Sequence, residues 1–418
     1  MINTLVKRFD SLELWRKIFV SVSVFMIAVV ALFTMIIGFS GMDNHFFALA
    51  VSFLHGHLYF VPRPSVTSVS DMVMFKGNYF WPLGPFPAIL IVPLAMLGQV
   101  MRVSAVHSQA LLDVILSAGI IYLIISICKS FGYRTFDAWF FAFAFIAGTG
   151  LMHLVITSYS WYYAQVVSVF FTFVALREYF YKKRYWIIGC TLACVVATRV
   201  TAGFGALFFI VEILLHHEPA REKIKKIGMI LIPIFAACCL LALYNFFRFG
   251  SFLEQGYSMQ MVNLASISKA RAYGLFNIVH IPGNLFYAFL RGPLPYFKDG
   301  VSHVLKFPYI YPDLWGMGIF FTSPYLLTLF FIPYSKAVIR NLLITSCFIA
   351  LPIFMYYGIG YIQFGYRYAF DFIPYLFLIF IIGYKEMRQS LSWRMILLFL
   401  ISAGFNFYMI MTMFAFKY

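Results

Sequence analysis

The sequence predicts an all-α polytopic membrane protein with about 11 transmembrane helices and with interfacial helices in its first outer loop. Of its 418 residues, 63% are hydrophobic and only 11% are charged, whereas a soluble domain has about 25% charged residues. Aromatic residues make up 21% of the chain. The basic residues lie in short tufts between long apolar runs, which is typical of membrane proteins. These observations exclude a soluble enzyme, a disordered chain and a disulfide-stabilised scaffold, and they give no indication of a nucleic-acid partner.

The apolar runs set the number of predicted spans, because a spanning helix needs about 20 apolar residues or slightly fewer. Eleven runs qualify: 18–38, 108–128, 136–152, 163–181, 185–198, 201–216, 227–246, 315–334, 341–358, 367–383 and 395–416. A twelfth run, 83–98, is interrupted by prolines and preceded by Trp81, a residue type common at membrane interfaces. A secretory signal peptide is the alternative for 18–38. That run is long for a signal peptide and lacks a clear cleavage site, which favours a retained anchor.

The positions of the basic residues predict the topology. Six tufts separate the runs: Lys7/Arg8/Arg16/Lys17, Lys129/Arg134, Lys182/Lys183/Arg184, Arg221/Lys223/Lys225/Lys226, Lys336/Arg340 and Lys385/Arg388/Arg394. If all tufts are cytoplasmic, an even number of spans separates each consecutive pair. Residues 83–98 then enter the membrane surface without crossing it. The chain is therefore predicted to be one membrane domain, 1–418, with two long outer loops, 39–107 and 247–314. Functional residues are expected in these loops, because long irregular loops in a compact protein usually carry function.

The first outer loop begins with a predicted amphipathic helix that ends near Gly56. Its apolar face comprises Phe46, Phe47, Ala50, Phe53, Leu54 and Leu58, and His45, Ser52 and His55 lie off that face. Asp43 immediately precedes this helix, where the helix dipole favours a carboxylate. Two interpretations remain open for Asp43. It is either a helix cap or a functional acid at the outer mouth of a membrane bundle, where acids are costly and tend to have a function.

Further along this loop, Asp71 precedes a predicted tight turn from Lys76 to Tyr79, which leads into a proline-rich stretch that ends at Pro87. The turn contains glycine and asparagine, which suit a reversal of the chain. An ordinary turn or surface residue is the alternative interpretation of Asp71, and a solvated turn lysine is the alternative for Lys76.

Five short motifs resemble those of the GT-C class of membrane glycosyltransferases, which includes protein O-mannosyltransferases and the lipid A aminoarabinose transferase. The motifs are Asp43-Asn44 after the first span, Pro82-Leu83-Gly84-Pro85, Ala197-Thr198-Arg199-Val200-Thr201, Tyr244-Asn245-Phe246-Phe247-Arg248-Phe249-Gly250-Ser251 and Phe364-Gly365-Tyr366-Arg367-Tyr368. The resemblance extends over most of the chain, and each motif is short. It implies a GT-C-like helical bundle.

The sequence departs from this class at two positions. The acidic pair that follows the first span in these families is here Asp43 followed by Asn44. The predicted outer loop 157–163 has no acid, whereas the metal-dependent oligosaccharyltransferase branch has a DxD motif there. We therefore expect no metal ion and no cofactor. The chain also lacks dinucleotide-binding, P-loop and serine-hydrolase motifs.

The resemblance implies transfer of a sugar from a polyprenyl-phosphate donor to a glycan, lipid or protein acceptor on the outer face of the membrane. Asp43 is the expected general base. Arg199 and Arg367 are the expected ligands of the donor phosphate; the alternatives are that they snorkel to lipid headgroups or pair with an acid, which for Arg367 is Asp371 one helical turn away. Five further residues are expected to support the site or bind substrate: Asn44, His45, Asp71, Lys76 and Tyr79.

Two other functions remain open. One is a transporter or flippase of lipid-linked sugars, although transporters often have internal repeats and charges at the membrane midplane, and here the acids gather near the outer edge. The other is a non-catalytic scaffold, for which an outer acid has no evident use. The expected location is a bacterial inner membrane, with membrane lipids as neighbours and the active site facing outward.

Overall fold

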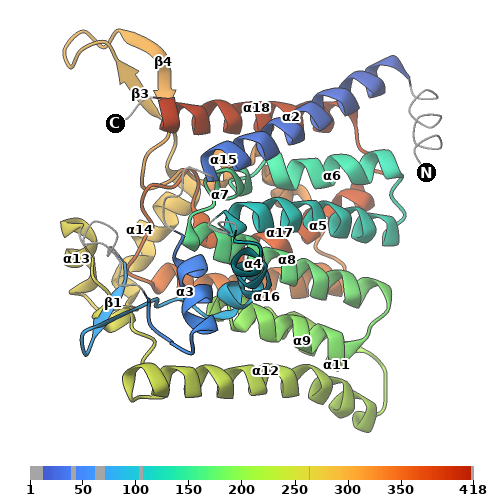
Figure 1. The fold of residues 1–418 in the computed structure, drawn as a ribbon. Helices are drawn as coiled ribbons and strands as arrows, with labels where there is room; N and C mark the ends of the chain where they lie inside the picture. The colour runs from blue at the N-terminus through green and yellow to red at the C-terminus, as the bar shows by residue number, and fades with distance from the viewer. Residues whose placement is uncertain (1–12, 39–43, 62–70, 103–106, 263, 416–418) are drawn as a thin grey trace.

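The structure is a computed structural model that describes residues 13–38, 44–61, 71–102, 107–262 and 264–415. This part of the chain is nearly all helical, and its strands form two separate antiparallel hairpins. The long helices run roughly alongside one another in a single bundle (Figure 1). The predicted all-α architecture is therefore confirmed.

Five described helices are long and apolar enough to cross a bilayer: α2 (Leu14–Gly38), α5 (Ser108–Ser130), α12 (Ala220–Phe249), α16 (Ala337–Met355) and α18 (Trp393–Ala415). A bent pair forms a sixth if it is counted as one span: α6 (Thr135–Ala147) and α7 (Leu151–Thr157), whose axes differ by 62°. The chain is thus a multi-pass membrane protein. The number of about 11 spans remains a prediction, because the other expected spans correspond to helices that are shorter or less apolar.

The remaining helices of the bundle are α8 (Ser160–Tyr181), α9 (Tyr185–Val196), α10 (Val200–Gly203), α11 (Ala206–Leu215) and α17 (Ile373–Met387). The break predicted between the runs 185–198 and 201–216 is present, and in the structure it comprises Ala197–Arg199. The prediction of one spanning helix over 315–334 is wrong. This stretch forms α15 (Ile319–Thr322) and a 3-10 helix, η5 (Pro324–Phe331), because Pro324 has no N–H to donate and disfavours a helical conformation of Ser323.

Close backbone approach and aromatic packing hold the bundle together. A side chain at Gly189 of α9 would lie within 2.6–2.9 Å of backbone atoms of Met229 and Ile230 in α12, so only glycine allows this contact. The centre is filled by rings: Tyr325 packs against Phe380 at 5.5 Å and against Phe399 at 5.0 Å. Small residues and dense packing of this kind replace the hydrophobic effect as the force that holds helices together within a membrane.

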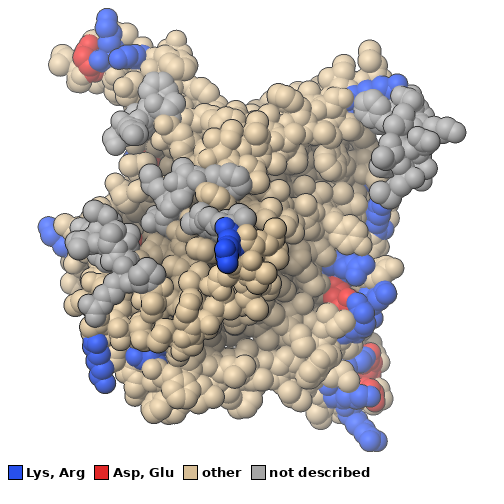
Figure 2. Space-filling model, viewed as in Figure 1, with Lys and Arg blue, Asp and Glu red and all other residues tan. Residues whose placement is uncertain are grey.

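The six basic tufts meet at one end of the bundle, as far as their residues are described. Arg16 lies over the Phe136 ring at 5.3 Å. Lys385 donates to the Gly132 carbonyl at 3.1 Å, and Lys336 donates to Glu386 at 2.7 Å. Lys226 also lies over the Tyr185 ring, and the Phe131 ring packs against the Phe180 ring. These contacts join the remaining tufts to the same end of the bundle. In Figure 2 most of the visible Lys and Arg side chains lie along the right edge, where the α5–α6, α8–α9 and α11–α12 turns lie in Figure 1.

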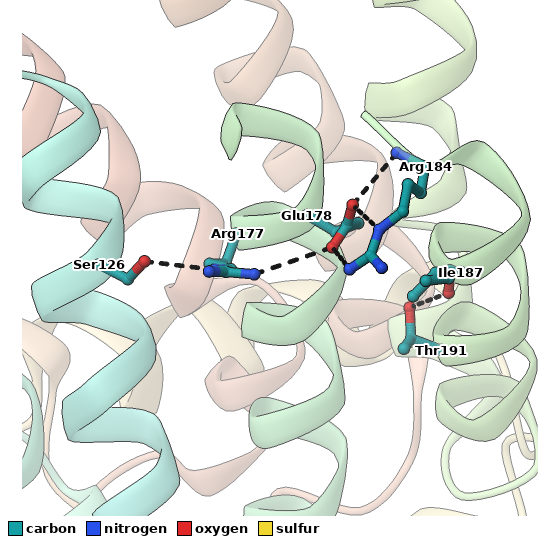
Figure 3. Close-up of polar contacts among 6 residues, drawn as sticks. All are labelled: Ser126, Arg177, Glu178, Arg184, Ile187 and Thr191. Carbon is teal, nitrogen blue, oxygen red and sulfur yellow. Dashed lines mark hydrogen bonds and ion pairs between the residues drawn. The ribbon is translucent and has the colours of Figure 1, made fainter. Parts of the chain in front are cut away.

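A buried carboxylate fixes the α8–α9 turn at this basic end. Glu178 accepts hydrogen bonds from Nε and Nη2 of Arg184, both at 2.8 Å, and from the Arg184 backbone N–H at 3.2 Å. Arg177 lies 3.9 Å from the same carboxylate and donates to Ser126 of α5 at 3.2 Å (Figure 3). The basic tuft at the α8–α9 turn is therefore tied to α5 as well as to its own helix.

The opposite end of the bundle carries the described parts of both predicted outer loops. From the first loop come α3 (His45–Leu54), β1 (Val73–Phe75), β2 (Asn78–Phe80) and α4 (Phe86–Met101). From the second come η2 (Tyr257–Met259), α13 (Ala265–Arg271), η3 (Ile278–His280), α14 (Ile281–Leu285), η4 (Phe286–Leu290), β3 (Leu294–Phe297) and β4 (Leu305–Tyr311). Most of these elements lie on the left of Figure 1, away from the basic tufts. We call this region the loop end.

Candidate functional site

The N-terminus of α3 is the part of the predicted site closest in sequence to the expected base. Asp43 itself lies outside the described residues. Asn44 is the N-cap of α3 but makes no capping hydrogen bond with its side chain. The backbone N–H of His45 donates to Ser160 Oγ at 2.8 Å, and that of Phe46 donates to Gln109 Oε1 at 3.2 Å. The first two N–H groups of α3 are therefore satisfied by side chains from other helices.

The structure corrects the predicted face of α3. The sequence pattern placed His45 and Ser52 away from the apolar side, yet both are buried along with Phe46 and Ala50. The His45 ring stacks on the Trp81 ring, with centroids 4.1 Å apart and planes 9° apart. Helical periodicity reports which side chains are apolar, but it does not reveal polar residues that are buried because they have partners elsewhere in the fold.

A buried polar network extends from the start of α3 into α5. Gln109 Nε2 donates to the Ser158 carbonyl at 3.1 Å, and the Ser158 hydroxyl donates to Asp113 Oδ2 at 2.6 Å. The side chains of Asp113 and Gln109 are fully buried. Asp113 Oδ1 accepts no hydrogen bond from any described residue. Each member thus fixes the next, from Asp113 to the first turn of α3.

The sequence prediction missed this network, although a signal for it was present. Gln109 and Asp113 lie in the otherwise apolar run 108–128, and polar residues within a span are expensive and often functional. Asp113 lies inside a predicted span rather than in an outer loop, and the sequence pattern assigned it no role. Because it lies one helical turn from Gln109, it faces the same side of α5.

Replacing Ser158 with Ala is expected to lower the free energy of unfolding by about 1–3 kcal/mol, because Asp113 Oδ2 would lose its described donor in a buried position. Ser402→Ala is the control, since that hydroxyl donates only to Leu398 of its own helix, at 2.8 Å, and should cost less. Thermal unfolding of the purified protein in one detergent measures both variants. Equal effects of the two substitutions would argue against a network that depends on Ser158.

The two arginines predicted to bind phosphate come together at the loop end, but with different partners. Arg199 forms a bidentate pair with Asp371, with Nε–Oδ1 at 2.5 Å and Nη2–Oδ2 at 2.9 Å. Burial alone would lower the pKa of Arg199, but the Asp371 carboxylate outweighs burial and holds that pKa above its ordinary value. Thr201 also donates to Asp371. The alternative of pairing with an acid thus holds for Arg199, and the positive charge of Arg199 is largely balanced.

Arg367 does not pair with Asp371, so the alternative of an ion pair across one helical turn is wrong. Arg367 begins the short 3-10 helix η6 (Arg367–Asp371), so the two side chains do not have the α-helical spacing. In the described part of the chain no carboxylate pairs with Arg367. Its guanidinium carbon lies 4.9 Å from the Tyr368 ring centroid and 5.4 Å from that of Tyr162. Arg367 therefore carries an unbalanced positive charge against aromatic faces.

The N-terminus of α8 joins α3 to the arginines. Trp161 lies 5.7 Å from the His45 ring, and the next residue, Tyr162, contacts Arg367. The Tyr368 ring lies between the two arginines, 5.8 Å from the Arg199 guanidinium carbon. The expected residues His45, Arg199 and Arg367 are thus linked through one turn of α8 and one tyrosine, although they are far apart in the sequence.

The proline-rich element anchors α4 to the same region. The Phe86 N–H donates at 3.2 Å to the carbonyl of Ala197, two residues before Arg199. A side chain at Gly84 would lie 2.1 Å from that same carbonyl oxygen. Glycine is required at this position because the chain passes directly over the break that precedes α10.

Asp71, Lys76 and Tyr79 make their described contacts with other parts of the outer loops rather than with the two arginines. The Asp71 N–H donates to the Met261 carbonyl at 2.9 Å, and Gln260 donates to the Asp71 carboxylate at 3.3 Å, so Asp71 ties the two outer loops together. Lys76 and Gly77 occupy the predicted tight turn with φ of 48° and 79°, which is the conformation of a two-residue hairpin turn. Tyr79 is half-buried, and its carbonyl accepts the Phe60 N–H at 2.9 Å.

A cavity of about 440 Å³ lies between this hairpin and the end of α12. Lys76 and Arg248 both line it, together with His57, Asn78 and Phe247. Arg248 is buried; it donates to the Trp81 carbonyl at 2.7 Å and to Asn245 at 2.6 Å. Within the described residues neither cation pairs with a carboxylate, and no acid lines the cavity. Its charge therefore suits an anion.

The loop end also contains a neutral hydroxyl near the arginines. Burial raises the pKa of Tyr257 to about 12, so this hydroxyl keeps its proton at physiological pH. Arg271 holds the same segment by donating to the Tyr257 carbonyl at 2.6 Å and to the Gln260 carbonyl at 2.9 Å. In the described ranges, no three His, Cys, Asp or Glu side chains cluster closely enough to hold a metal ion. Metal independence remains a prediction.

Comparison with known protein families and with curated proteins finds no match. Among solved structures, the chain is similar to the apo form of an oligosaccharyltransferase from Archaeoglobus fulgidus, with 14% sequence identity and a TM-score of 0.42. The match covers 93% of this chain and 55% of that one. The chain thus spans about half the length of that protein, and a likeness of this size carries no argument about function.

Proposed function

We propose that this protein is a membrane glycosyltransferase that moves a sugar from a polyprenyl-phosphate donor to an acceptor, with the loop end as its active site. One observation carries the proposal. The fold brings the start of α3, directly after Asp43, together with Arg367 and Arg199 through the N-terminus of α8. This juxtaposition supports the proposal, because a transfer from a phosphate leaving group requires a base and cations at one site.

Asp43 is the proposed general base, and the hydrogen bonding of α3 supports this role over that of a helix cap. Ser160 and Gln109 already accept the hydrogen bonds of the first two α3 N–H groups. A carboxylate from Asp43 is therefore not needed to satisfy them. As the bond from the acceptor oxygen to C1 of the sugar forms and the bond from C1 to the phosphate oxygen breaks, the carboxylate takes the acceptor proton.

The leaving phosphate is proposed to meet Arg367, whose charge no described carboxylate balances. A guanidinium can donate two parallel hydrogen bonds to a phosphate. Arg199 keeps its proposed role in phosphate binding, but its pairing with Asp371 makes it the weaker contributor. The cavity with Lys76 and Arg248 offers two further cations near the exposed Phe247 of α12, a suitable neighbour for the lipid part of the donor.

Arg367→Gln is expected to lower the rate of transfer about 100-fold, by analogy with the loss of one donor that stabilises a developing negative charge. Lys76→Gln, which removes a cation of the neighbouring cavity rather than the proposed phosphate ligand, should have a smaller effect, mainly on KM. Lys298→Gln on the β3–β4 hairpin is the control, because Lys298 is an exposed turn lysine that does not line the cavity. If Arg367→Gln transferred sugar as fast as the control, its proposed contact with the phosphate would be wrong.

The proposal is tested by reconstituting the purified protein in liposomes with a panel of polyprenyl-phosphate sugars and an extract of envelope acceptors. Mass spectrometry then follows the release of free polyprenyl phosphate and the appearance of sugar on an acceptor. We expect both products to form together. Movement of a fluorescent lipid-linked sugar across the bilayer without any release of polyprenyl phosphate would instead establish the flippase alternative.

The proposed location is a bacterial inner membrane with the loop end outside. The gathering of the basic tufts at the other end supports this orientation, because cytoplasmic loops are enriched in Lys and Arg. Labelling of the loop end by a reagent that does not cross the membrane tests this orientation in intact cells.

A further inference from the structure

The Tyr368 hydroxyl lies beside the guanidinium group of Arg367. Nη2 of Arg367 donates a hydrogen bond to this hydroxyl oxygen at 3.2 Å. A tyrosine hydroxyl can accept and donate at the same time, so Tyr368 keeps its own proton for a further partner. In the residues that the structure describes, no group accepts that proton. The hydroxyl is therefore an available donor within hydrogen-bonding distance of a cation.

The backbone that carries these two side chains is held in place by α8. Gln165 of α8 is buried and donates to the Arg367 carbonyl at 3.0 Å. Tyr162, almost one turn earlier in α8, donates to the Ile362 carbonyl. Arg367 Nε is itself buried, and no described group accepts its hydrogen. The Arg367 guanidinium and the Tyr368 hydroxyl are thus fixed beside each other, and preorganised donors of this kind stabilise a developing negative charge.

The charge of the leaving phosphate changes during the proposed transfer. In the donor, the phosphate joins the sugar to the lipid and carries one negative charge. When the bond from C1 of the sugar to the phosphate oxygen breaks, both electrons stay on that oxygen, and the acceptor proton goes to the base. The product is a polyprenyl phosphate with two negative charges. Arg367 can balance the first charge, and the second, which develops in the transition state, needs a further donor.

We propose that the Tyr368 hydroxyl donates a hydrogen bond to the leaving phosphate and is a catalytic residue alongside Arg367. Arg199 is less suited to this task, because its Nε and Nη2 groups already bind Asp371. The role of Tyr368 rests on the proposed function, because it concerns the same phosphate. The hydrogen bond strengthens as the phosphate gains its second charge, so Tyr368 should favour the transition state and the released lipid phosphate over the bound donor.

The alternative role of Tyr368 is purely structural, as an aromatic surface between two guanidinium groups. Its ring centroid lies 4.9 Å from the guanidinium carbon of Arg367 and 5.8 Å from that of Arg199. Tyr368→Phe keeps the ring and removes only the hydroxyl, whereas Tyr368→Leu removes both. We expect Tyr368→Phe to lower kcat about 10–100-fold with little change in KM, since a hydrogen bond to a charged group contributes that much. A kcat equal to that of the parent in Tyr368→Phe would overturn the inference, whatever the effect of Tyr368→Leu.

Tyr366→Phe is the matched control for the loss of one tyrosine hydroxyl. Tyr366 is buried, and its hydroxyl donates to Asn284 Oδ1 at 2.8 Å. This substitution should lower the unfolding temperature, because Asn284 loses a buried donor, and should leave kcat close to that of the parent. Tyr368→Phe should show the reverse pattern, with a lower kcat and a smaller change in unfolding temperature. Equal losses of stability and of kcat in the two variants would indicate a structural role and overturn the inference.

Binding of lipid phosphates tests Tyr368 separately from sugar transfer. Isothermal titration calorimetry at pH 8 compares farnesyl phosphate, a doubly charged monoester at this pH, with its methyl diester, which has one charge like the donor. Tyr368→Phe should raise the Kd of the monoester about tenfold and that of the diester much less. An unchanged Kd of the monoester, or no binding of it to the parent, would overturn the inference. A tenfold rise in a protein that transfers no sugar would support the phosphate contact and count against the proposed function instead.

Discussion

Replacing Asp43 with Asn or Ala is expected to lower the rate of sugar transfer about 10²–10⁴-fold, because general-base catalysis contributes about that much. Asn keeps the shape of the side chain but cannot take a proton at neutral pH. The two substitutions should therefore have similar effects. The release of polyprenyl phosphate in proteoliposomes measures the rate.

Glu222→Gln is the matched control for the loss of one carboxylate. Glu222 is exposed in the first turn of α12, among the basic residues at the far end of the bundle, and its replacement should leave the rate unchanged. The stability of the Asp43 variants should also be close to that of the parent, because Ser160 and Gln109 accept the hydrogen bonds of the first two N–H groups of α3. Sugar transfer that survives both Asp43 substitutions would end the assignment of Asp43 as the base.

Replacing Asp371 with Asn is expected to destabilise the protein by about 3–5 kcal/mol, the usual cost of removing one partner of a buried ion pair. The Asp371 side chain is fully buried, and that of Arg199 is 11% exposed. Asn can accept one hydrogen bond from Arg199 or Thr201, but it leaves the guanidinium charge unbalanced. The temperature at which half of the soluble, monodisperse protein is lost on heating should be much lower for the variant.

The exposed pair of Lys336 and Glu386 is the control for this substitution. Its side chains are 49% and 37% exposed, so Glu386→Gln should cost at most about 1 kcal/mol. The double variant Arg199→Met/Asp371→Leu should recover much of the lost stability, because apolar replacement of a whole buried pair is often tolerated. Equal destabilisation by Asp371→Asn and Glu386→Gln would show that the pair of Arg199 and Asp371 is not buried in the folded protein.

Local chemistry made several features of the loop end predictable. Glycine at position 77 marked the tight turn, and polar residues between two apolar runs marked the break at Arg199. The basic tufts predicted which turns share one end of the bundle, because loops rich in Lys and Arg are preferentially cytoplasmic. Helix α3 was predicted for similar reasons, since it has a clear beginning and ends at Leu54, shortly before Gly56, where φ is +75°.

The partners of these residues were not predictable, because they come from distant parts of the chain. Ser160 accepts a hydrogen bond from an α3 N–H group 115 residues away in the sequence, and Gln109 accepts one from a group 63 residues away. Asp371 lies 172 residues from Arg199. The expected helix over 315–334 failed for a different reason. Its composition is apolar enough for a span, but the Ser323–Pro324 step breaks the helix, and composition alone does not weigh that cost.

The central claim is that the loop end, around the start of α3 and Arg367, receives the phosphate of a lipid-linked sugar donor. A structure of the protein with a bound polyprenyl-phosphate sugar analogue tests it most directly. We expect density for an elongated lipid tail that ends in a phosphate contacting Arg367, with the sugar next to the residues that precede α3. A phosphate bound at the basic end, beside the α5–α6 or α8–α9 turn, would contradict the claim.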